Sequence, residues 1–379
     1  MDDNLTDLII KRITAIPLTA RIQEGTRTSQ GDFGAVSMVL VEIETSEGLL
    51  GYGECLGRFG PVAYAEFIQN VLAPKIMGQS AFEIRRLWKL MRSSLSGRAG
   101  GILIECIAGI DIALWDLVGK GTNQPIHRLL GGMGRDLVDC YASSLNWAPI
   151  NVMVQQALAV KAMGFKTIKV KLGQPLDRAI EAAGAVREAV GSKIVLGVDA
   201  NWAYSLDDAI KVGAALDRLN YWFFEEPIAP EDVEGYSLLR AKVPIMLAGG
   251  ESDFTVAHAR ELIEKRAVGL IQPDVARSGG ISETRDIAIL AHAFHIGYAP
   301  HVGWSGAVCV AASLQLASAM PAFITYECMF IDNPLRDELT LSPIGSPSLL
   351  VNGQMPIPKL PGLGIEINWK SVSKYRVDK

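Results

Sequence analysis

Short apolar runs and longer amphipathic stretches alternate through the second half of the chain. Amphipathic stretches such as 176–191 and 280–295 place apolar residues at helical spacing. Uninterrupted alternation of strand and helix favours a parallel sheet with covered faces, and eight repeats predict that the sheet closes into a barrel. The eight candidate strands are VDCYASS (138–144), TIKVKL (167–172), IVLGVDA (194–200), WFFEEP (222–227), IMLAGG (245–250), GLIQPD (269–274), YAPH (298–301) and FITYE (323–327).

The first third of the chain has a different pattern. Residues 8–55 alternate between apolar and polar positions, which predicts a small antiparallel sheet, and residues 62–120 follow helical spacing. Between the first two predicted strands, the glycine-containing polar segment 24–35 is typical of a loop that can cover a pocket. We therefore expect an α+β domain that packs against the barrel.

Three regions follow from these patterns. We predict an N-terminal capping domain over 1–130, the barrel over 131–330, and a C-terminal segment over 331–379. The GGMG sequence at 131–134 links the first two regions, and the tail contains many prolines and glycines but no long helical pattern. We expect this tail to return to the capping domain.

Composition excludes several classes of protein. The 379 residues are 49% hydrophobic and 20% charged, with a formal net charge of −5 and no dense stripe of Lys or Arg, which argues against nucleic acid as a partner. The five cysteines lack CxxC spacing, which is typical of free thiols in a reducing, cytoplasmic compartment. The start of the chain is acidic and does not resemble a secretory signal.

One long uncharged run raises the question of a membrane span. Residues 296–326 contain no Asp, Glu, Lys or Arg, which exceeds the length of a spanning helix. Pro300, Pro321, three glycines and His301 interrupt the run. We interpret it as a buried part of the barrel and not a membrane segment, and its lack of charge makes a contact in a homo-oligomer plausible.

Charged residues recur at the ends of the predicted strands. They follow one another at intervals of 23 to 28 residues, which fits one strand, one helix and two connections. Because the carboxyl ends of barrel strands meet at one mouth, these side chains should form a ring at the place where barrel enzymes carry their chemistry. The residues are Lys171, Asp199, Glu225, Glu251, Asp274, His301 and Glu327.

Two lysines share one predicted strand. Lys169 and Lys171 are two positions apart, so both side chains point to the same side of the strand. Inside a barrel, each lysine disfavours the charge of the other, and partial burial disfavours the charge of both. One of them could therefore act as a base at neutral pH. Spacing alone allows equally that both are solvated at a strand end.

Three carboxylates end consecutive strands. Asp199, Glu225 and Glu251 are separated by equal steps of 26 residues. Converging carboxylates without His or Cys suit a hard cation with oxygen ligands, for which magnesium is the default. A single such acid would more often be a helix cap or a surface residue. The pattern alone does not decide whether Glu225 or Glu226 faces inward.

An acid and an imidazole end the next two strands. If Asp274 and His301 meet, the carboxylate would orient the ring and raise its proton affinity. A lone histidine near an apolar helix is more often structural, and we interpret the other four histidines in that way.

Taken together, these residues resemble the enolase superfamily, and specifically its mandelate racemase-like subgroup. The resemblance covers nearly the whole chain. It implies an α+β capping domain on a modified (β/α)7β barrel, a variant of the TIM barrel, and abstraction of the proton α to a carboxylate with Mg²⁺ stabilising the enediolate. The motifs that carry it are ALWDLVGK (113–120), KVK (169–171), DAN (199–201), EEP (225–227), GGE (249–251), PD (273–274) and His301.

The resemblance also implies roles for individual residues. Asp199, Glu225 and Glu251 correspond to the metal ligands, which favours Glu225 over Glu226. Lys171 resembles the base on one face of the substrate, with Lys169 as its electrostatic neighbour. His301, paired with Asp274, resembles the acid or base on the opposite face. Glu327 resembles the group that hydrogen-bonds the substrate carboxylate, and Asn201 a substrate-hydroxyl contact.

One feature selects the subgroup. No lysine occurs between Arg266 and Leu290, so the branch that uses a second lysine after the sixth strand is disfavoured. Arg277 lies in that region instead. The His301–Asp274 pair then points to the mandelate racemase-like branch.

The same ring of residues permits two reactions. We predict a dehydratase that eliminates water from a sugar acid to give a 2-keto-3-deoxy acid, because the polar loop and Arg27 and Arg58 suit a hydroxylated substrate. The alternative is a racemase or epimerase of a 2-hydroxy or amino acid, and a remote one is a barrel that binds a ligand without turnover. In each case the expected partner is a small carboxylate.

Overall fold

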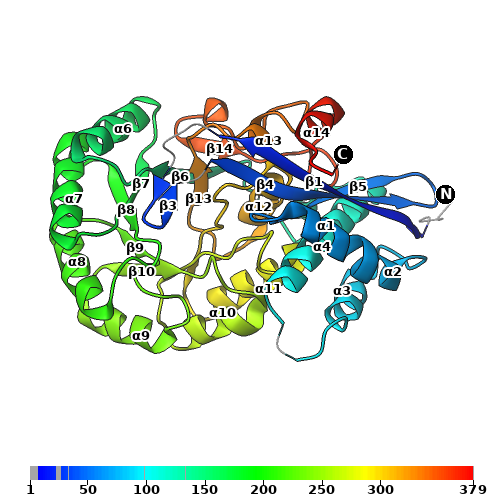
Figure 1. The fold of residues 1–379 in the computed structure, drawn as a ribbon, viewed down its shortest axis with the longest axis horizontal. Coiled ribbons are helices and arrows are strands. Elements are labelled where there is room, and N and C mark those ends of the chain that lie inside the picture. The colour runs from blue at the N-terminus through cyan, green and yellow to red at the C-terminus, as the bar shows by residue number, and fades with distance from the viewer. Residues whose placement is uncertain (1–6, 23–26, 33, 98, 133, 379) are drawn as a thin grey trace.

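The computed structural model describes residues 7–22, 27–32, 34–97, 99–132 and 134–378. Figure 1 shows a curved ring of strands and helices, coloured from green to orange, with the blue and cyan N-terminal elements packed beside it. The red C-terminal elements lie against both parts. The chain is thus the predicted α/β barrel with an α+β cap.

The cap contains the predicted antiparallel sheet. Its order is β1 (Ile10–Arg21), β4 (Ala35–Thr45), β5 (Leu50–Cys55), and β2 (Arg27–Thr28) pairs with β3 (Gly31–Asp32) in a separate hairpin. Alternate residues of β4 enter two different cores: Val39 and Val41 pack with the cap helices, whereas Met38 and Leu40 belong to the core shared with the barrel. The period-2 pattern therefore reflects a sheet that is covered on both faces.

The cap helices pack on this sheet. A long helix, α4, lies between the sheet and the barrel; Gly53 and Gly109 let β5 approach it, since a Cβ on Gly53 would lie 1.8 Å from the carbonyl oxygen of Gly109. Most residues of α4 are buried, which explains its nearly continuous apolar sequence. The helices are α1 (Pro61–Phe67), the π-helical turn η1 (Ile68–Leu72), α2 (Ala73–Ile76), α3 (Ile84–Arg92), α4 (Ile102–Gly121) and α5 (Ile126–Leu129).

Eight parallel strands form the barrel, as the sequence predicts. In spatial order the sheet runs β12, β11, β10, β9, β8, β7, β6, β13. The two ends meet where Tyr298 of β12 exchanges hydrogen bonds with residues 322 and 324, just before β13. The strands are β6 (Leu137–Leu145), β7 (Thr167–Lys171), β8 (Val195–Asp199), β9 (Phe223–Glu225), β10 (Met246–Gly249), β11 (Leu270–Ile271), β12 (Gly297–Tyr298) and β13 (Tyr326–Met329).

Helices between the strands cover the barrel. In α7, Ala179, Ala182, Ala183, Val186 and Val190 are buried at helical spacing and face the strands. The helices are α6 (Ile150–Ala162), α7 (Leu176–Val190), α8 (Leu206–Arg218), α9 (Val233–Lys242), α10 (Thr255–Glu264), α11 (Gly280–Ala293) and α12 (Ala307–Ala319).

Helix α12 explains the uncharged run. Every residue of this helix is buried within the one chain, where it contacts α5, α13 and β5. Helix α12 is therefore apolar because the protomer encloses it, whereas Ile324 after it is 46% exposed. A contact of this run in a homo-oligomer stays a prediction. None of the helices in the described ranges combines the length and apolarity that crossing a membrane requires.

The C-terminal segment joins both parts of the molecule. Its elements are α13 (Pro334–Asp337), the 3₁₀ turn η2 (Pro347–Leu349), β14 (Gln354–Pro356) and α14 (Trp369–Tyr375). Strand β14 pairs antiparallel with β6 of the barrel, and Val377 donates a backbone hydrogen bond to Pro17 of β1. The domain boundaries at residues 130 and 330 remain predictions.

Candidate active site

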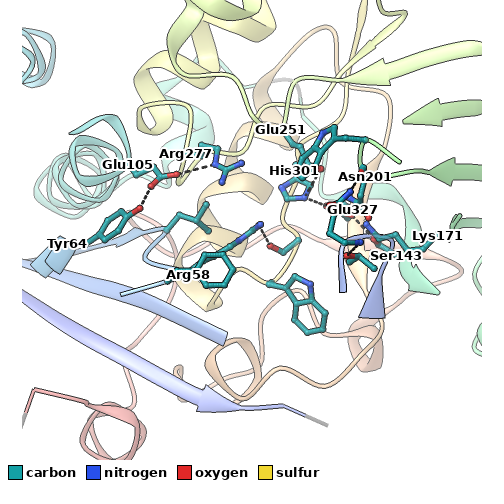
Figure 2. A pocket seen from close by; sticks show the side chains of 17 residues that line it. Arg58, Tyr64, Glu105, Ser143, Lys171, Asn201, Glu251, Arg277, His301 and Glu327 are labelled. Atoms are coloured by element: carbon teal, nitrogen blue, oxygen red, sulfur yellow. Dashed lines mark hydrogen bonds and ion pairs between the residues drawn. The ribbon is translucent and has the colours of Figure 1, made fainter. Parts of the chain in front are cut away.

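The predicted residues gather at the carboxyl ends of the barrel strands. They surround a cavity of about 330 Å³ that also reaches the cap (Figure 2). Some of them line the cavity and others lie buried behind its wall. Lys171, Asp199 and Glu225 end β7, β8 and β9; Glu251, Asp274 and His301 follow β10, β11 and β12; Glu327 lies in β13.

The three carboxylates form one cluster. Asp199, Glu225 and Glu251 each place an oxygen within 4.8 Å of the others, and all three are buried. The register explains part of this, because Asp199 lies directly opposite Glu225 in the β8–β9 pair. Burial and the neighbouring carboxylates raise the pKa of Glu225 to about 8. Ionising all three carboxylates is therefore unfavourable unless a cation compensates their charge.

The structure distinguishes the two glutamates that the sequence pattern left open. Glu225 joins the cluster, whereas the carboxylate of Glu226 accepts hydrogen bonds from the Gly250 amide at 2.9 Å and from the Trp202 indole. Burial raises the pKa of Glu226 well above its ordinary value. Glu226 thus holds the loop after β10 and is not part of the cluster.

The cluster fits a divalent cation. Five acids meet here with three basic groups, so full ionisation would leave a net negative charge even with His301 protonated. The buried Oε2 of Glu251 accepts no hydrogen bond from the described residues, although His301 Nε2 lies 3.2 Å away. Oxygen-only donors suit Mg²⁺ and similar hard cations.

Both lysines of β7 point into the ring. The Nζ of Lys169 lies 2.5 Å from Glu225 Oε1 and 2.8 Å from Glu327 Oε1. Burial alone would lower the pKa of Lys169, but these carboxylates outweigh it and raise the pKa well above its ordinary value. The ammonium of Lys171 contacts Asp199 and lines the cavity. Lys169 is therefore a fixed cation, and Lys171 is the lysine that a substrate can reach.

Asp274 and His301 form a hydrogen-bonded pair. The Nδ1 of His301 lies 2.8 Å from Asp274 Oδ2, and the backbones of the two residues form a parallel bridge. Burial lowers the pKa of His301, but Glu251, Glu327 and Asp274 together raise it to about 9. The imidazole is therefore protonated at neutral pH and can serve as a proton donor.

Glu327 is held by three donors. The Ser143 hydroxyl and Lys169 Nζ lie 2.6 and 2.8 Å from its Oε1, and the Val302 amide donates to Oε2 at 2.7 Å. Burial alone would raise the pKa of Glu327, but Lys169 and His301 outweigh it and lower the pKa well below its ordinary value. An ionised Glu327 accepts hydrogen bonds only.

The loop residues reach the cavity unevenly. Thr28, Gln30, Asn201 and Arg58 line it, whereas Arg27 is exposed and does not. Gln30 donates to the carbonyl of Asn201, so the 27–32 hairpin is attached to the barrel mouth beside Asp199. Within the predicted polar loop, residues 24–26 and 33 lie outside the described residues.

The sequence reasoning missed the contribution of the cap. Tyr64 and Glu105 line the cavity, and Glu105 accepts hydrogen bonds from Tyr64 Oη at 2.6 Å and from Arg277 Nε at 3.1 Å. Phe59 and Trp304 line the same cavity. An available signal was Glu105 itself, because an acid within the apolar run 102–114 requires a buried partner.

Comparison with known families covers almost the whole chain. Residues 152–371 match the family model described as enolase C-terminal domain-like. Residues 12–131 match the mandelate racemase/muconate lactonizing enzyme N-terminal domain.

Similar proteins include sugar-acid enzymes. A D-galactarolactone cycloisomerase from Agrobacterium fabrum is 33% identical over 97% of this chain and 99% of its own length. An arabinonate dehydratase from Saccharolobus solfataricus is 34% identical over 90% of this chain and 91% of its own. A solved structure from Bordetella bronchiseptica RB50, complexed with 2-oxoglutarate/phosphate, is 31% identical, has a TM-score of 0.91, and covers 98% of this chain and 99% of its own.

Proposed function

The chain belongs to the mandelate racemase/muconate lactonizing enzyme family of the enolase superfamily, and from this premise we propose that it is a Mg²⁺-dependent acid-sugar dehydratase. The substrate is a sugar acid that loses its α-proton and a β-hydroxyl. The product is a 2-keto-3-deoxy acid.

One observation carries the proposal: Lys171 and His301 line the same cavity as Glu251 of the carboxylate cluster. Lys171 comes from β7 and His301 follows β12, so the two proton-transfer groups reach the cavity from different parts of the barrel. A β-elimination needs one group that removes a proton and another that supplies one.

Asp199, Glu225 and Glu251 would hold the metal. When bound, Mg²⁺ supplies a Lewis acid for the substrate oxygens and stabilises the negative charge that develops beside the carboxylate. In the structure, Lys171 pairs with Asp199. The same lysine lines the cavity, where a substrate can reach it.

Lys171 then removes the proton from the α-carbon, and the electron pair is held as the enediolate of the substrate carboxylate. This pair next forms a double bond between the α-carbon and the β-carbon. The bond from the β-carbon to its oxygen breaks, and the protonated His301 donates a proton to that oxygen, which departs as water. The resulting enol takes up a proton at the β-carbon and becomes the 2-keto-3-deoxy acid. Asp274, which is not one of the three clustered carboxylates, is among the charges that raise the pKa of His301 and favour this donor form.

Neighbouring residues position these groups. Asp274 fixes the ring of His301 through Nδ1, which directs Nε2 to the cavity. Lys169 remains cationic and favours the negative charge of the intermediate. We assign Glu327 to the neighbourhood of the substrate carboxylate, where Lys169 Nζ, 2.8 Å from its Oε1, offsets the charge of the ionised Glu327. We assign Asn201, whose buried Oδ1 lacks a partner among the described residues, to accept a hydrogen bond from a substrate hydroxyl.

A second candidate is a cycloisomerase, because the relative from Agrobacterium fabrum carries that name over nearly the full length of both chains. When the leaving oxygen belongs to a ring of the substrate, the same two proton transfers open the ring and no water is lost. Racemisation is the third outcome of the same proton abstraction, with His301 returning the proton.

The three reactions are distinguished by incubating the Mg²⁺-loaded protein in D₂O with a panel of aldonates, aldarates and their lactones. Dehydration gives a product that has lost water and contains deuterium beside its carbonyl. Ring opening leaves the mass unchanged apart from deuterium but alters the NMR connectivity. Deuterium at the α-carbon without either change contradicts the proposal.

Two further expectations belong with this function. We place the enzyme in the cytoplasm, supported by five free, buried cysteines. We also expect a homo-oligomer, which light scattering on the purified protein tests; a monomer at all concentrations would contradict it.

A further inference from the structure

Two arginines lie at the cap side of the cavity. Arg58 follows β5 of the cap, and Arg277 lies in the connection between β11 and α11. Figure 2 places the guanidinium of Arg277 between Glu105 and the side of the cavity formed by Glu251 and His301, with Arg58 next to it. Both arginines line the cavity.

The two guanidinium groups have unused donors. Arg58 donates from one terminal nitrogen to the Gly303 carbonyl at 2.8 Å, but its buried Nε has no partner and no carboxylate of the described residues lies within ion-pair distance. Arg277 uses Nε for Glu105, and its terminal nitrogens make no hydrogen bond with the described residues. A buried donor without a partner is costly, so its retention points to a ligand.

Direct ion pairs at this end leave Arg58 without a carboxylate partner in the described part of the chain. Glu105 is the one carboxylate paired with either arginine in the described part of the chain, and it also accepts from Tyr64. Burial, and after it the proximity of Arg277, lowers the pKa of Arg58. One additional anion between the two guanidinium groups would relieve this repulsion.

We propose that Arg58 and Arg277 bind a second carboxylate at the end of the substrate remote from the reacting carbon, so that the substrate is a sugar diacid or its lactone. This rests on the proposed function for the reacting end. The substrate carboxylate next to the reacting carbon would lie near the cluster of Asp199, Glu225 and Glu251, and the distal substrate carboxylate would lie near the cap. Gly303 links Arg58 to His301. Arg58 donates a hydrogen bond to the Gly303 carbonyl, and a Cβ added to Gly303 would lie 2.6 Å from His301 Nε2.

The test compares acids that differ only at the distal end. For turnover, galactarate is compared with galactonate and glucarate with gluconate. For binding, calorimetry on the Mg²⁺-loaded protein compares 2-oxoglutarate with 2-oxopentanoate, which has a methyl group in place of the distal carboxylate. Each charge-assisted contact is worth about a factor of ten, so we expect a preference of about 100-fold for the diacid.

Variants assign the preference to the two residues. Arg58→Met and Arg277→Met should each reduce the ratio of diacid to monoacid affinity by about tenfold. Arg218→Met, at an exposed position of α8, should leave the preference unchanged. Arg277 also joins the barrel to the cap through Glu105. If Arg277→Met does not fold, the diacid preference of Arg58→Met alone decides the test. Equal affinity for both oxoacids in the wild type, or a preference retained in Arg58→Met, would overturn the inference.

The binding arm separates this inference from the proposed function. A diacid preference that depends on Arg58, with no water loss or α-exchange from any acid, would refute the dehydratase and keep the diacid site. Equal dehydration of aldonates and aldarates, with equal affinity for the two oxoacids, would confirm the dehydratase and refute the diacid site. If inorganic phosphate binds at the two arginines more tightly than 2-oxoglutarate does, the arginines recognise a phosphorylated substrate. That result would overturn the proposal that they bind a second carboxylate.

Discussion

The Nδ1 atom of His301 lies 2.8 Å from Oδ2 of Asp274, and the other oxygen of Asp274 accepts the Ala276 amide at 2.9 Å. The carboxylate is therefore fixed at both oxygens, and it in turn fixes the imidazole. With its proton on Nδ1 committed to Asp274, the ring presents Nε2 to the substrate. The orientation of His301 thus depends on Asp274, which does not line the cavity.

Replacing Asp274 should shift the pH profile. His301 is the proton donor, so activity is present while it is protonated and is lost as the pH rises through its pKa, about 9 in the native protein. Asp274→Asn removes one of the charges that raise this pKa, so the basic limb of kcat should move to lower pH and kcat should fall by roughly 10²-fold or more. Steady-state rates between pH 6 and 10 measure both; an unmoved limb would contradict the donor role. Asp217→Asn, on the exposed face of α8, is the matched control.

Removing the base should abolish proton abstraction. Lys171→Met keeps the approximate length of the side chain but has no basic nitrogen, so kcat should fall by roughly 10³-fold or more. Lys242→Met, exposed on α9, should retain full activity. If Lys171→Met still exchanges the substrate α-hydrogen with D₂O at the wild-type rate, another residue is the base.

Metal removal should affect both activity and stability. The clustered carboxylates repel one another without a cation, so EDTA treatment should abolish turnover and lower the melting temperature, and Mg²⁺ should restore both. At 100 times the dissociation constant, binding adds about 2.7 kcal/mol to the free energy of unfolding. Glu251→Gln should weaken this response, whereas Glu264→Gln, exposed on α10, should not. An unchanged melting temperature on adding Mg²⁺ to the stripped wild type would argue against the site.

A buried carboxylate far from the chemistry should control stability. Asp116 of α4 accepts the backbone amides of Tyr52 and Leu363 at 2.9 and 2.8 Å and pairs with Lys120 at 2.6 Å, thereby joining the cap sheet to the C-terminal segment. Asp116→Ala leaves these donors buried and unpaired and should cost about 3–5 kcal/mol in the free energy of unfolding. Urea titration measures the loss, with the exposed Asp217→Ala as control; a change below about 1 kcal/mol would contradict this role.

The sequence predicted the barrel and the ring because both depend on local periodicity. Charged residues such as Asp199 and Glu225 end buried strands, and parallel strands bring their ends together whatever the loop details. The family resemblance favoured Glu225 over Glu226 as the inward-facing carboxylate. The structure agrees, because the carboxylate of Glu226 accepts a hydrogen bond from the Gly250 amide. The roles of these residues in catalysis remain predictions.

The sequence could not predict the contacts between cap and barrel. Glu105 and Arg277 are 172 residues apart, and no periodicity relates a cap helix to a barrel loop. Arg27 was expected at the substrate but is exposed, since the orientation of a short hairpin is set by tertiary contacts. The apolar 296–326 run was interpreted as a buried part of the barrel, which the burial of α12 confirms, and its contact in a homo-oligomer stays a prediction.

The central claim is the division of work between Lys171 and His301, and α-hydrogen exchange in two variants tests it most directly. The Mg²⁺-loaded His301→Asn and Lys171→Met proteins are incubated in D₂O with an acid that the wild type dehydrates, and deuterium in the recovered substrate is measured by mass spectrometry. We predict that His301→Asn exchanges the α-hydrogen without forming the keto acid, and that Lys171→Met does neither. Exchange in Lys171→Met but not in His301→Asn would make His301 the base and contradict the account.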